Sequence, residues 1–417
     1  MLLIWERTKM KEGADIYGYK KQLGDEIRKL GKLKDISEKN KNFILEFQRY
    51  GALQNLSLPR QIRYISILRI ISRHLGKDFD VVNKKDIERL IGIIQGLDLS
   101  PWTKNTYKVM LKRFYKWLKG NDEEYPPEVK WIKSNVKRSD EKLPSEGELI
   151  TEVEIKKLIE TAKYPRDKAF VSMLYESGCR IGELASLNIE NVVFDQYGIV
   201  LTVQGKTGSR KVRLIASTPY LMAWLQCHPR KNERKAALWA ELRGKEEILH
   251  YDAIRMFLRR LFKKAGIDKR CNPHFLRHSR ATYMANHLTE FQMNQYFGWI
   301  QGSRMPAVYV HLSGKETDKA IFEMNGIKTE KETKESELKP KKCSRCDTIN
   351  GSESKYCLKC AGILDIKTAI ELEERRKEEN ETRKSSDSLM DLLIKDEEFK
   401  EMFARKIIEM KSLIIPN

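Results

Sequence analysis

The stretch that decides the fold of this chain runs from residue 177 to residue 184 and reads Ser-Gly-Cys-Arg-Ile-Gly-Glu-Leu. We predict helices on both sides of Cys179, over residues 166–178 and 180–187. Three short strands are predicted next, at residues 192–194, 199–203 and 212–215. Residues 205–209, Gly-Lys-Thr-Gly-Ser, form the turn between the last two strands. Because helices dominate again afterwards, the stretch lies in a mixed α/β domain.

Two further motifs follow in order. Residues 274–278 read His-Phe-Leu-Arg-His, and Gly298-Trp299 is followed ten residues after Trp299 by Tyr309. The side chains that carry the chemistry are Arg180, Lys206, His274, Arg277, Trp299 and Tyr309. Breaking a phosphodiester needs a nucleophile, stabilisation of charge on the phosphate and a proton for the leaving oxygen. A tyrosine can attack, and two permanently charged guanidinium groups can bind the non-bridging oxygens in place of a metal ion.

The order and spacing of these motifs resemble the tyrosine recombinases, the superfamily of phage integrases and Xer proteins, and especially its archaeal members. Tyr309 follows His274 by 35 residues, the usual separation in that family. The interval from Trp299 to Tyr309 is one residue longer than the commonest pattern, so residues 300–304 are expected to absorb an insertion. The resemblance covers about residues 40–325. It implies a mainly α fold with a small β-sheet, in which a helical DNA-binding domain precedes an α/β catalytic domain.

The expected reaction begins when Tyr309 attacks the DNA backbone, which leaves a 3′-phosphotyrosine and a free 5′-hydroxyl. Arg180 and Arg277 are expected to hold the phosphate. His274 is expected to act as general base toward Tyr309 or to hydrogen-bond the phosphate. The resemblance makes Lys206 the general acid for the 5′ oxygen.

The sequence also indicates roles for other residues near the motifs. Trp299 stands where most family members have a second histidine; its indole can donate a hydrogen bond but cannot shuttle a proton. Glu183 matches a family carboxylate that holds the active site in place. The hairpin cations expected to contact DNA are Arg210, Lys211 and Arg213. We interpret His278 and His311 as structural, and the rival tyrosines, Tyr283 and Tyr296, lie too early in the chain.

Charge and apolar patterning indicate the partner. The 417 residues include 79 Lys plus Arg against 59 Asp plus Glu, a net charge of +20, which suits a polyanion. Of the helices predicted in the first third of the chain, one opens at Ser57-Leu58-Pro59 and another at Ser100-Pro101. The second has a basic side, and its candidate DNA contacts are Lys104 and Lys108. No stretch has the length and apolar character of a membrane span or signal peptide, so the sequence predicts a cytoplasmic, nucleoid-associated protein without a membrane partner.

A cysteine cluster follows the catalytic motifs. Cys343 and Cys346 form one CxxC pair, and Cys357 and Cys360 form a second. Four thiolates at this spacing predict a closed, tetrahedral zinc site that is structural, because no ligand position stays open for catalysis. We therefore expect a zinc ribbon with one structural Zn²⁺ and no cofactor for catalysis.

The expected domains are an N-terminal extension (1–34), a helical core-binding domain (35–120), a linker (121–148), a catalytic domain (149–327), a charged linker (328–342), the zinc ribbon (343–362) and a charged helical tail (363–417). The tail has an amphipathic pattern that suits either an oligomerisation helix or a segment packed on the body. The family resemblance implies four subunits on double-stranded DNA at specific sites, with strands exchanged without ATP or metal. We expect an integrase or excisionase of a virus or plasmid. A Xer-like resolvase of chromosome or plasmid dimers and a catalytically silent DNA-binding regulator are the alternatives.

Overall fold

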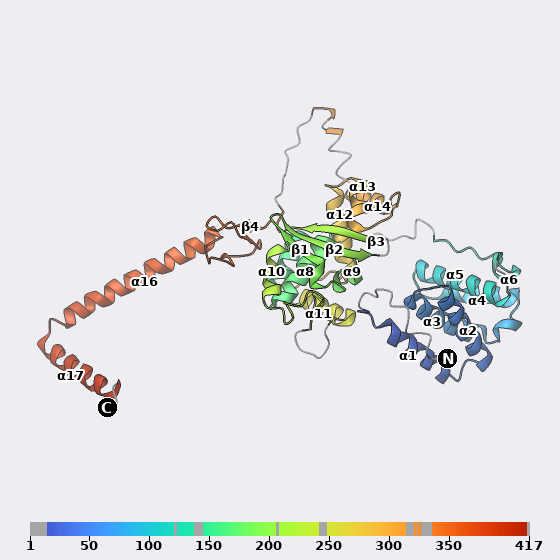
Figure 1. Ribbon diagram of the computed structural model, residues 1–417, viewed down its shortest axis with the longest axis horizontal. Helices are drawn as coiled ribbons and strands as arrows, with labels where there is room; N and C mark the ends of the chain where they lie inside the picture. The colour runs from blue at the N-terminus through green and yellow to red at the C-terminus, as the bar shows by residue number, and fades with distance from the viewer. Residues whose placement is uncertain are drawn as a thin grey trace.

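The computed structural model describes residues 15–120, 123–136, 145–205, 208–241, 248–313, 321, 322, 324–326 and 336–414. These residues form a mainly helical molecule with a small antiparallel sheet, which confirms the predicted fold class (Figure 1). Lys206, and most of the predicted charged linker, lie outside the described residues. No helix among the described residues has both the length and the apolar character that crossing a bilayer would require.

A helical unit occupies the first third of the chain. Its helices are α1 (Tyr19–Lys32), α2 (Glu38–Leu53), α3 (Leu58–Leu75), α4 (Lys84–Gly96), α5 (Pro101–Leu118) and the single turn α6 (Pro127–Lys130), with a 3₁₀ turn at Phe79–Val81. The predicted helix starts are present: proline follows Ser57 closely in α3, and the Ser100 hydroxyl accepts a hydrogen bond from the Thr103 amide at the start of α5. Leu68 and Phe114 are fully buried at its core.

The helical unit begins earlier than the predicted boundary at residue 35. Leu30 of α1 is fully buried in the same core, and Leu23 and Ile27 pack against it. Glu26 of α1 also accepts a hydrogen bond from Arg69 of α3 at 3.1 Å. The segment predicted to be an extension is therefore, from Tyr19 onward, part of the unit.

The second unit contains all three motifs. Its helices are α7 (Glu152–Thr161), α8 (Pro165–Ser177), α9 (Ile181–Ala185), α10 (Thr218–Gln226), α11 (Tyr251–Lys264), α12 (Pro273–Ala285), α13 (Glu290–Phe297) and α14 (Met305–Ser313), with 3₁₀ turns at Glu146–Glu148 and Ile189–Asn191. The strands β1 (Val192–Asp195), β2 (Gly198–Gly205) and β3 (Gly208–Leu214) pair antiparallel in that order. Gly205 pairs with Gly208 at the end of the hairpin formed by β2 and β3. From Ala169 to Ser177 every residue of α8 is buried, which places this helix at the centre of the unit.

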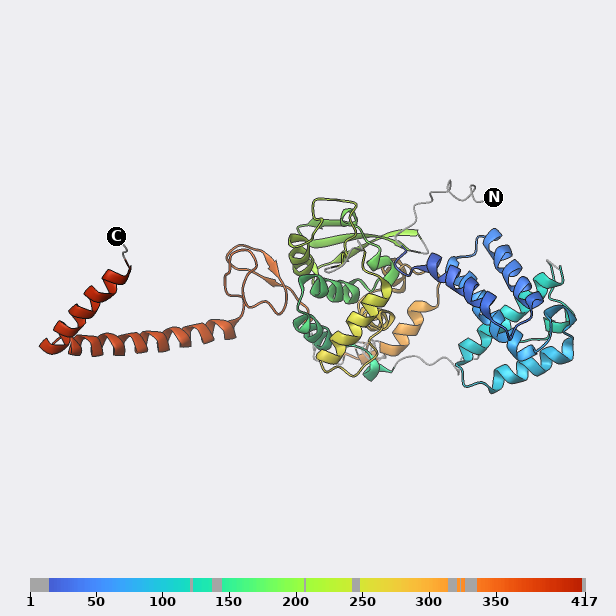
Figure 2. The same ribbon diagram turned by 90° about the horizontal axis from the view of Figure 1, so that it is seen from below.

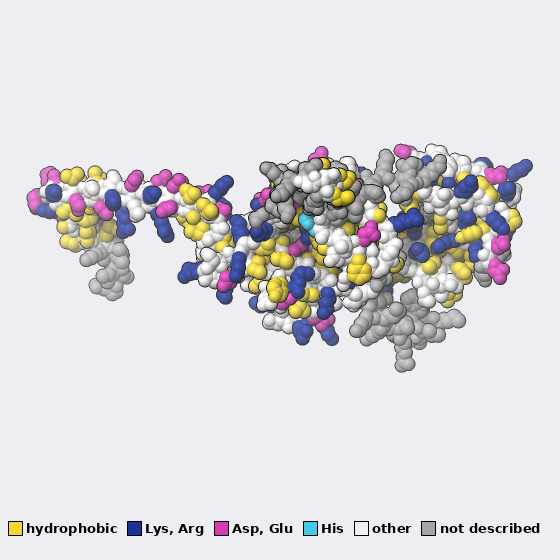
Figure 3. Space-filling model, turned by 90° about the horizontal axis from the view of Figure 1, so that it is seen from above, with side chains coloured by type: hydrophobic (Ala, Val, Ile, Leu, Met, Phe, Trp, Pro, Cys, Tyr) yellow, Lys and Arg dark blue, Asp and Glu magenta, His cyan; other side chains and the backbone are white. Residues whose placement is uncertain are grey.

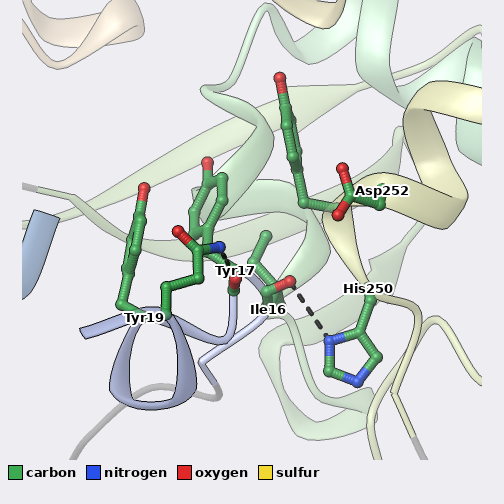
Figure 4. A pocket seen from close by; sticks show the side chains of 7 residues that line it. Ile16, Tyr17, Tyr19, His250 and Asp252 are labelled. Atoms are coloured by element: carbon green, nitrogen blue, oxygen red, sulfur yellow. Dashed lines mark hydrogen bonds between the residues drawn. The ribbon is translucent and has the colours of Figure 1, made fainter. Parts of the chain in front are cut away.

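An N-terminal strap, residues 15–18, joins the two units at a second point besides the chain that follows α5 (Figure 2). Ile16 is 2% exposed within the core of the second unit, and its carbonyl accepts hydrogen bonds from the Tyr251 amide (3.0 Å) and the His250 ring (3.3 Å). Gly18 has φ = 66°, a left-handed conformation that glycine adopts readily, and this turn starts α1. The strap and α11 border a cavity of about 440 Å³ in which Tyr17 lies beside Tyr19 (Figure 4).

The chain ends in a small cysteine-rich lobe and an arm. The lobe contains β4 (Lys341–Lys342) and β5 (Ile349–Asn350), and it contacts α10 through a hydrogen bond between Tyr220 and Glu353. The arm consists of α16 (Ile366–Leu393) and α17 (Glu397–Ile414), and it extends away from the body (Figures 1 and 2).

Candidate active site

The junction between α8 and α9 positions the first arginine. Gly178 ends α8 with φ = 53°, and a Cβ there would lie 2.5 Å from the ring of Phe297, so only glycine fits. Arg180 directly precedes α9, and its guanidinium donates to the buried Glu183 carboxylate at 2.8 Å while remaining partly open to solvent. This geometry leaves Arg180 oriented and accessible to an anion.

Glu183 joins Arg180 to a second arginine. Its other carboxylate oxygen accepts hydrogen bonds from the Arg180 amide (3.0 Å) and from Arg210 of β3 (2.7 Å). Burial alone would raise the pKa of Glu183, but the hydrogen bonds and charges of Arg210 and Arg180 outweigh burial and lower the pKa. Glu183 is therefore ionised, and its contacts are those of a residue that holds the site together.

Arg277 lies at the centre of the site on α12. Its side chain is buried, and its two terminal nitrogens donate to the carbonyl oxygens of Gly178 (2.6 Å) and Phe297 (2.8 Å). Burial and then the charge of Arg180 lower its pKa to about 10, so Arg277 stays charged at neutral pH. A guanidinium has five N–H donors, so these two hydrogen bonds leave others for a phosphate.

Tyr309 lies in the same site with its hydroxyl paired. The Tyr309 hydroxyl and Nδ1 of His278 are 2.7 Å apart. The Tyr309 ring stacks on Trp299, with ring centres 5.4 Å apart and planes 4° from parallel. Tyr309 is only 2% exposed on α14, so this structure holds the hydroxyl away from solvent.

The proton stays on Tyr309 in this arrangement. Burial raises the pKa of Tyr309 to about 12, although the charge of Arg277 opposes that rise. Burial, followed by the charges of His274 and Arg277, lowers the pKa of His278 to about 4. Both side chains are therefore neutral at pH 7, and a neutral His278 can hydrogen-bond the phenol and accept its proton.

His278, interpreted from the sequence as structural, is thus the histidine that contacts Tyr309. It lies one helical turn beyond His274 on α12, and the two rings meet edge to face with centres 4.5 Å apart. The spacing of four residues could have revealed this, because side chains at i and i+4 share a helix face. The side chain of His311 lies outside the described residues. The rival Tyr296 donates to the Glu176 carbonyl at 2.8 Å, and Tyr283 packs against His287.

The expected DNA contacts differ in accessibility. Arg210 stays a prediction as a DNA contact, but in this structure its side chain is buried and hydrogen-bonded to Glu183 and the Tyr296 carbonyl. Lys211 and Arg213 are exposed, and Arg213 pairs with Asp195 at 2.6 Å. On α5, Lys104 donates to the Gln95 carbonyl at 2.7 Å, and Lys108 is partly exposed. Lys and Arg side chains also line the face of the helical unit beside the second unit (Figure 3).

The four predicted metal ligands come together. The sulfur atoms of Cys343, Cys346, Cys357 and Cys360 all lie within 4.8 Å of one another. Tetrahedral Zn–S bonds of ~2.3 Å would place sulfur atoms about 3.8 Å apart, so the cluster fits Zn²⁺. Asp347 and Ala361, each directly after the second cysteine of a pair, both have φ = 56°, so the two halves of the site turn alike. These cysteines could hold a structural ion, and the lobe lies apart from Tyr309.

Comparisons with known proteins identify the fold and the family. Residues 148–316 match the phage integrase family. The tyrosine recombinase XerA of Pyrococcus horikoshii is 28% identical over 180 residues, which cover 43% of this chain and 62% of the relative. XerA of Pyrococcus furiosus is 30% identical over 179 residues, covering 42% and 61%. The match thus spans less than two thirds of either relative.

A solved structure agrees at the level of the fold. The integrase of transposon Tn1549 in complex with circular intermediate DNA superposes with a TM-score of 0.53 at 18% identity, covering 69% of this chain and 99% of that one. The family match and the motifs fall on the unit that contains Arg180, Arg277 and Tyr309. Residues 148–316 therefore match the phage integrase family, and the chain is similar to the Xer tyrosine recombinases.

Proposed function

We propose that this chain is a site-specific DNA recombinase that cuts and rejoins duplex DNA through a phosphotyrosine formed on Tyr309. The observation that carries the proposal is the hydrogen bond between the Tyr309 hydroxyl and His278, within the field of Arg277. Tyr309 Oη attacks the phosphorus, the bond from phosphorus to the 5′ oxygen breaks, and a 3′-phosphotyrosine forms. An incoming 5′-hydroxyl later reverses this step, so no external energy source is needed.

Charge and proton transfer are divided among the other side chains. Arg180 and Arg277 bind the non-bridging oxygens; a preorganised contact of this kind contributes about 3–4 kcal/mol to transition-state stabilisation. His278 accepts the phenolic proton, because a phosphate held by the two arginines would raise its pKa. His274 has an exposed side chain beside His278 and donates to the phosphate. Lys206 protonates the 5′ oxygen, the role its family position implies. Zn²⁺ in the cysteine lobe would stabilise that lobe and takes no part in these steps.

DNA binding must also uncover the nucleophile. Tyr309 is 2% exposed and stacked on Trp299, so a phosphate reaches its hydroxyl only after α14 shifts. The proposed substrate is double-stranded DNA held between the helical unit and the second unit, with four subunits on two sites. The Tn1549 integrase was solved with DNA, which supports this substrate.

For the biological role, we propose integration and excision of a virus or plasmid. The cysteine lobe and the arm exceed what a minimal resolvase needs, and the Tn1549 relative is a transposon integrase. The XerA relatives support the alternative, a Xer-like resolvase of chromosome or plasmid dimers. An assay on a plasmid carrying the two DNA flanks of the gene separates the two roles, since an integrase would excise the intervening element as a circle.

The test of the chemistry is covalent trapping. Full-length protein is mixed with nicked, labelled DNA from the gene's flanks in the presence of EDTA, and adducts are resolved on denaturing gels. We expect an adduct for the wild type and for the control Tyr283→Phe, and none for Tyr309→Phe. An adduct that survives in Tyr309→Phe would assign the nucleophile elsewhere. If the wild type binds these fragments without reacting, a catalytically silent regulator becomes the better description.

A further inference from the structure

The C-terminal arm carries an apolar surface that nothing in the described chain covers. From residue 373 to residue 410, every side chain except that of Phe399 is exposed. The large apolar side chains near the far end are between 37% and 68% exposed; they are Leu389, Met390, Leu392, Leu393, Ile394, Met402, Phe403, Ile407, Ile408 and Met410. Figure 3 shows hydrophobic side chains gathered there. We call this surface, residues 389–410, the arm patch.

The arm patch is too large and too remote to be covered by its own body. Soluble monomers rarely expose a contiguous apolar area above a few hundred Å². Between the body and the patch, residues 373–388 contain no apolar side chain larger than the aliphatic parts of Lys, Arg and Thr. At about 1.5 Å per residue, this polar stem of 16 residues is roughly 24 Å long and separates the patch from the first turns of α16. Within the part of the chain that the structure describes, no segment of the body covers the arm patch.

The charges of α17 identify the occupant. Its first half has Glu397, Glu398 and Glu401 against Lys400, a net charge of −2 (three negative, one positive). Its second half, to residue 410, has Arg405 and Lys406 against Glu409, a net charge of +1 (two positive, one negative). When the two-fold axis is perpendicular to two such helices, they run antiparallel, and each acidic half then faces the basic half of its partner, whereas a parallel pair would place like charges together.

We propose that the arm patch is a self-association surface, whose partner is the arm patch of a second copy in antiparallel orientation. This contact forms without DNA and does not depend on the proposed recombinase activity. A helix dipole alone would also favour acidic residues early and basic residues late in α17. The experiment must therefore test pairing between chains, and not only the stability of one helix.

The first experiment measures the oligomeric state of the protein. Full-length protein without DNA is followed by sedimentation velocity over a wide concentration range, with helix content checked by circular dichroism. We expect a reversible dimer for the wild type and a monomer for Phe403→Asp combined with Ile407→Asp. The control, Thr382→Asp with Ser385→Asp, adds the same charge to the polar stem and should dimerise as the wild type does. A wild type that stays monomeric at every concentration, or a patch variant that still dimerises, would overturn the proposal.

The second experiment uses charge-reversal variants to test whether the two helices pair in antiparallel orientation. The variant Glu398→Lys with Glu401→Lys, and the variant Arg405→Glu with Lys406→Glu, each place like charges together in an antiparallel pair. Each variant alone should form a dimer with an affinity roughly tenfold or more below that of the wild type. An equimolar mixture of the two variants should form a heterodimer with the wild-type affinity. Added salt should weaken the wild-type dimer, because its flanking charges attract. A mixture of the two variants that stays monomeric would overturn antiparallel pairing through these charges.

Discussion

At the scale of single residues, the pair formed by Tyr309 and His278 links chemistry to stability. The pKa of His278 is lowered from 6.5 to about 4 by burial and by neighbouring charges. Above pH 6.5 the ring is neutral in both the folded and the unfolded chain. As the pH falls from 6.5 toward 4, the unfolded chain binds a proton that the folded chain does not, so stability decreases.

This pair predicts a measurable pH effect. The full shift would correspond to about 3 kcal/mol, and screening of a half-buried ring by water reduces our expectation to about 1–2 kcal/mol. Urea unfolding at about pH 7.5 and about pH 5 should therefore show a smaller acid-induced loss for His278→Asn than for the wild type. Equal losses in the two proteins would show that His278 titrates normally in the folded state.

The residues of the hairpin show what the sequence could reveal and what it could not. Alternation along β3 places Arg210 on the same side as the buried Val212 and Leu214, and Lys211 and Arg213 on the other. The burial of Arg210 could therefore be predicted from the alternation of side chains along the strand. Its partner was not, because Glu183 lies on a different element and is brought close only by tertiary packing. The contact of His278 with Tyr309 likewise could not be predicted from the sequence, because it depends on where α14 packs.

At the scale of elements, the clustering of the four cysteines was predictable because they are local in sequence. Two CxxC pairs place four thiols at a spacing that suits one metal ion. The docking of the lobe on α10 through Tyr220 and Glu353 was not predictable, because the contact joins residues 133 positions apart. The start of the helical unit was missed for a similar reason, since the pattern of α1 does not say which core Leu30 enters.

Metal removal should loosen this element alone. In the metal-bound protein we expect Cys343, Cys346, Cys357 and Cys360 to resist thiol reagents, because bound thiolates are protected. Chelation should make these four reactive, as counted by mass spectrometry after alkylation, and Cys357→Ala should have the same effect on the remaining three. Covalent trapping on DNA should be unchanged. Four fully reactive cysteines in freshly purified protein that contains stoichiometric zinc would place the ion elsewhere.

At the scale of the whole molecule, the N-terminal strap joins two units that the linker alone would leave loosely connected. Ile16 is buried in the second unit, whereas Leu23 and Leu30 belong to the core of the helical unit. Tyr17 lies against α9, since a Cβ on Gly182 would be 3.3 Å from its hydroxyl. The strap therefore touches α9, the helix that directly follows Arg180.

Charge placed at Ile16 should detach the strap. Burying an unpaired carboxylate is unfavourable by several kcal/mol, so Ile16→Asp should release residues 15–18 from the second unit. Hydrogen exchange should then increase at Tyr251, whose amide donates to the Ile16 carbonyl. Lys21→Asp, at an exposed position of α1, is the matched control and should leave exchange at Tyr251 unchanged. Equal protection of Tyr251 in Ile16→Asp would mean that the strap is not held by this side chain.

Attachment at two points has a topological consequence. The chain leaves the second unit at the strap, builds the helical unit and returns through the linker, so the helical unit is an insertion within one continuous fold. A protease cut between residues 121 and 148 would give two bands on a denaturing gel but a single particle in native conditions, because the strap still spans both parts. Movement of one unit relative to the other is then limited while Ile16 stays buried in the second unit. Free separation of the two halves would first require Ile16 to leave its core.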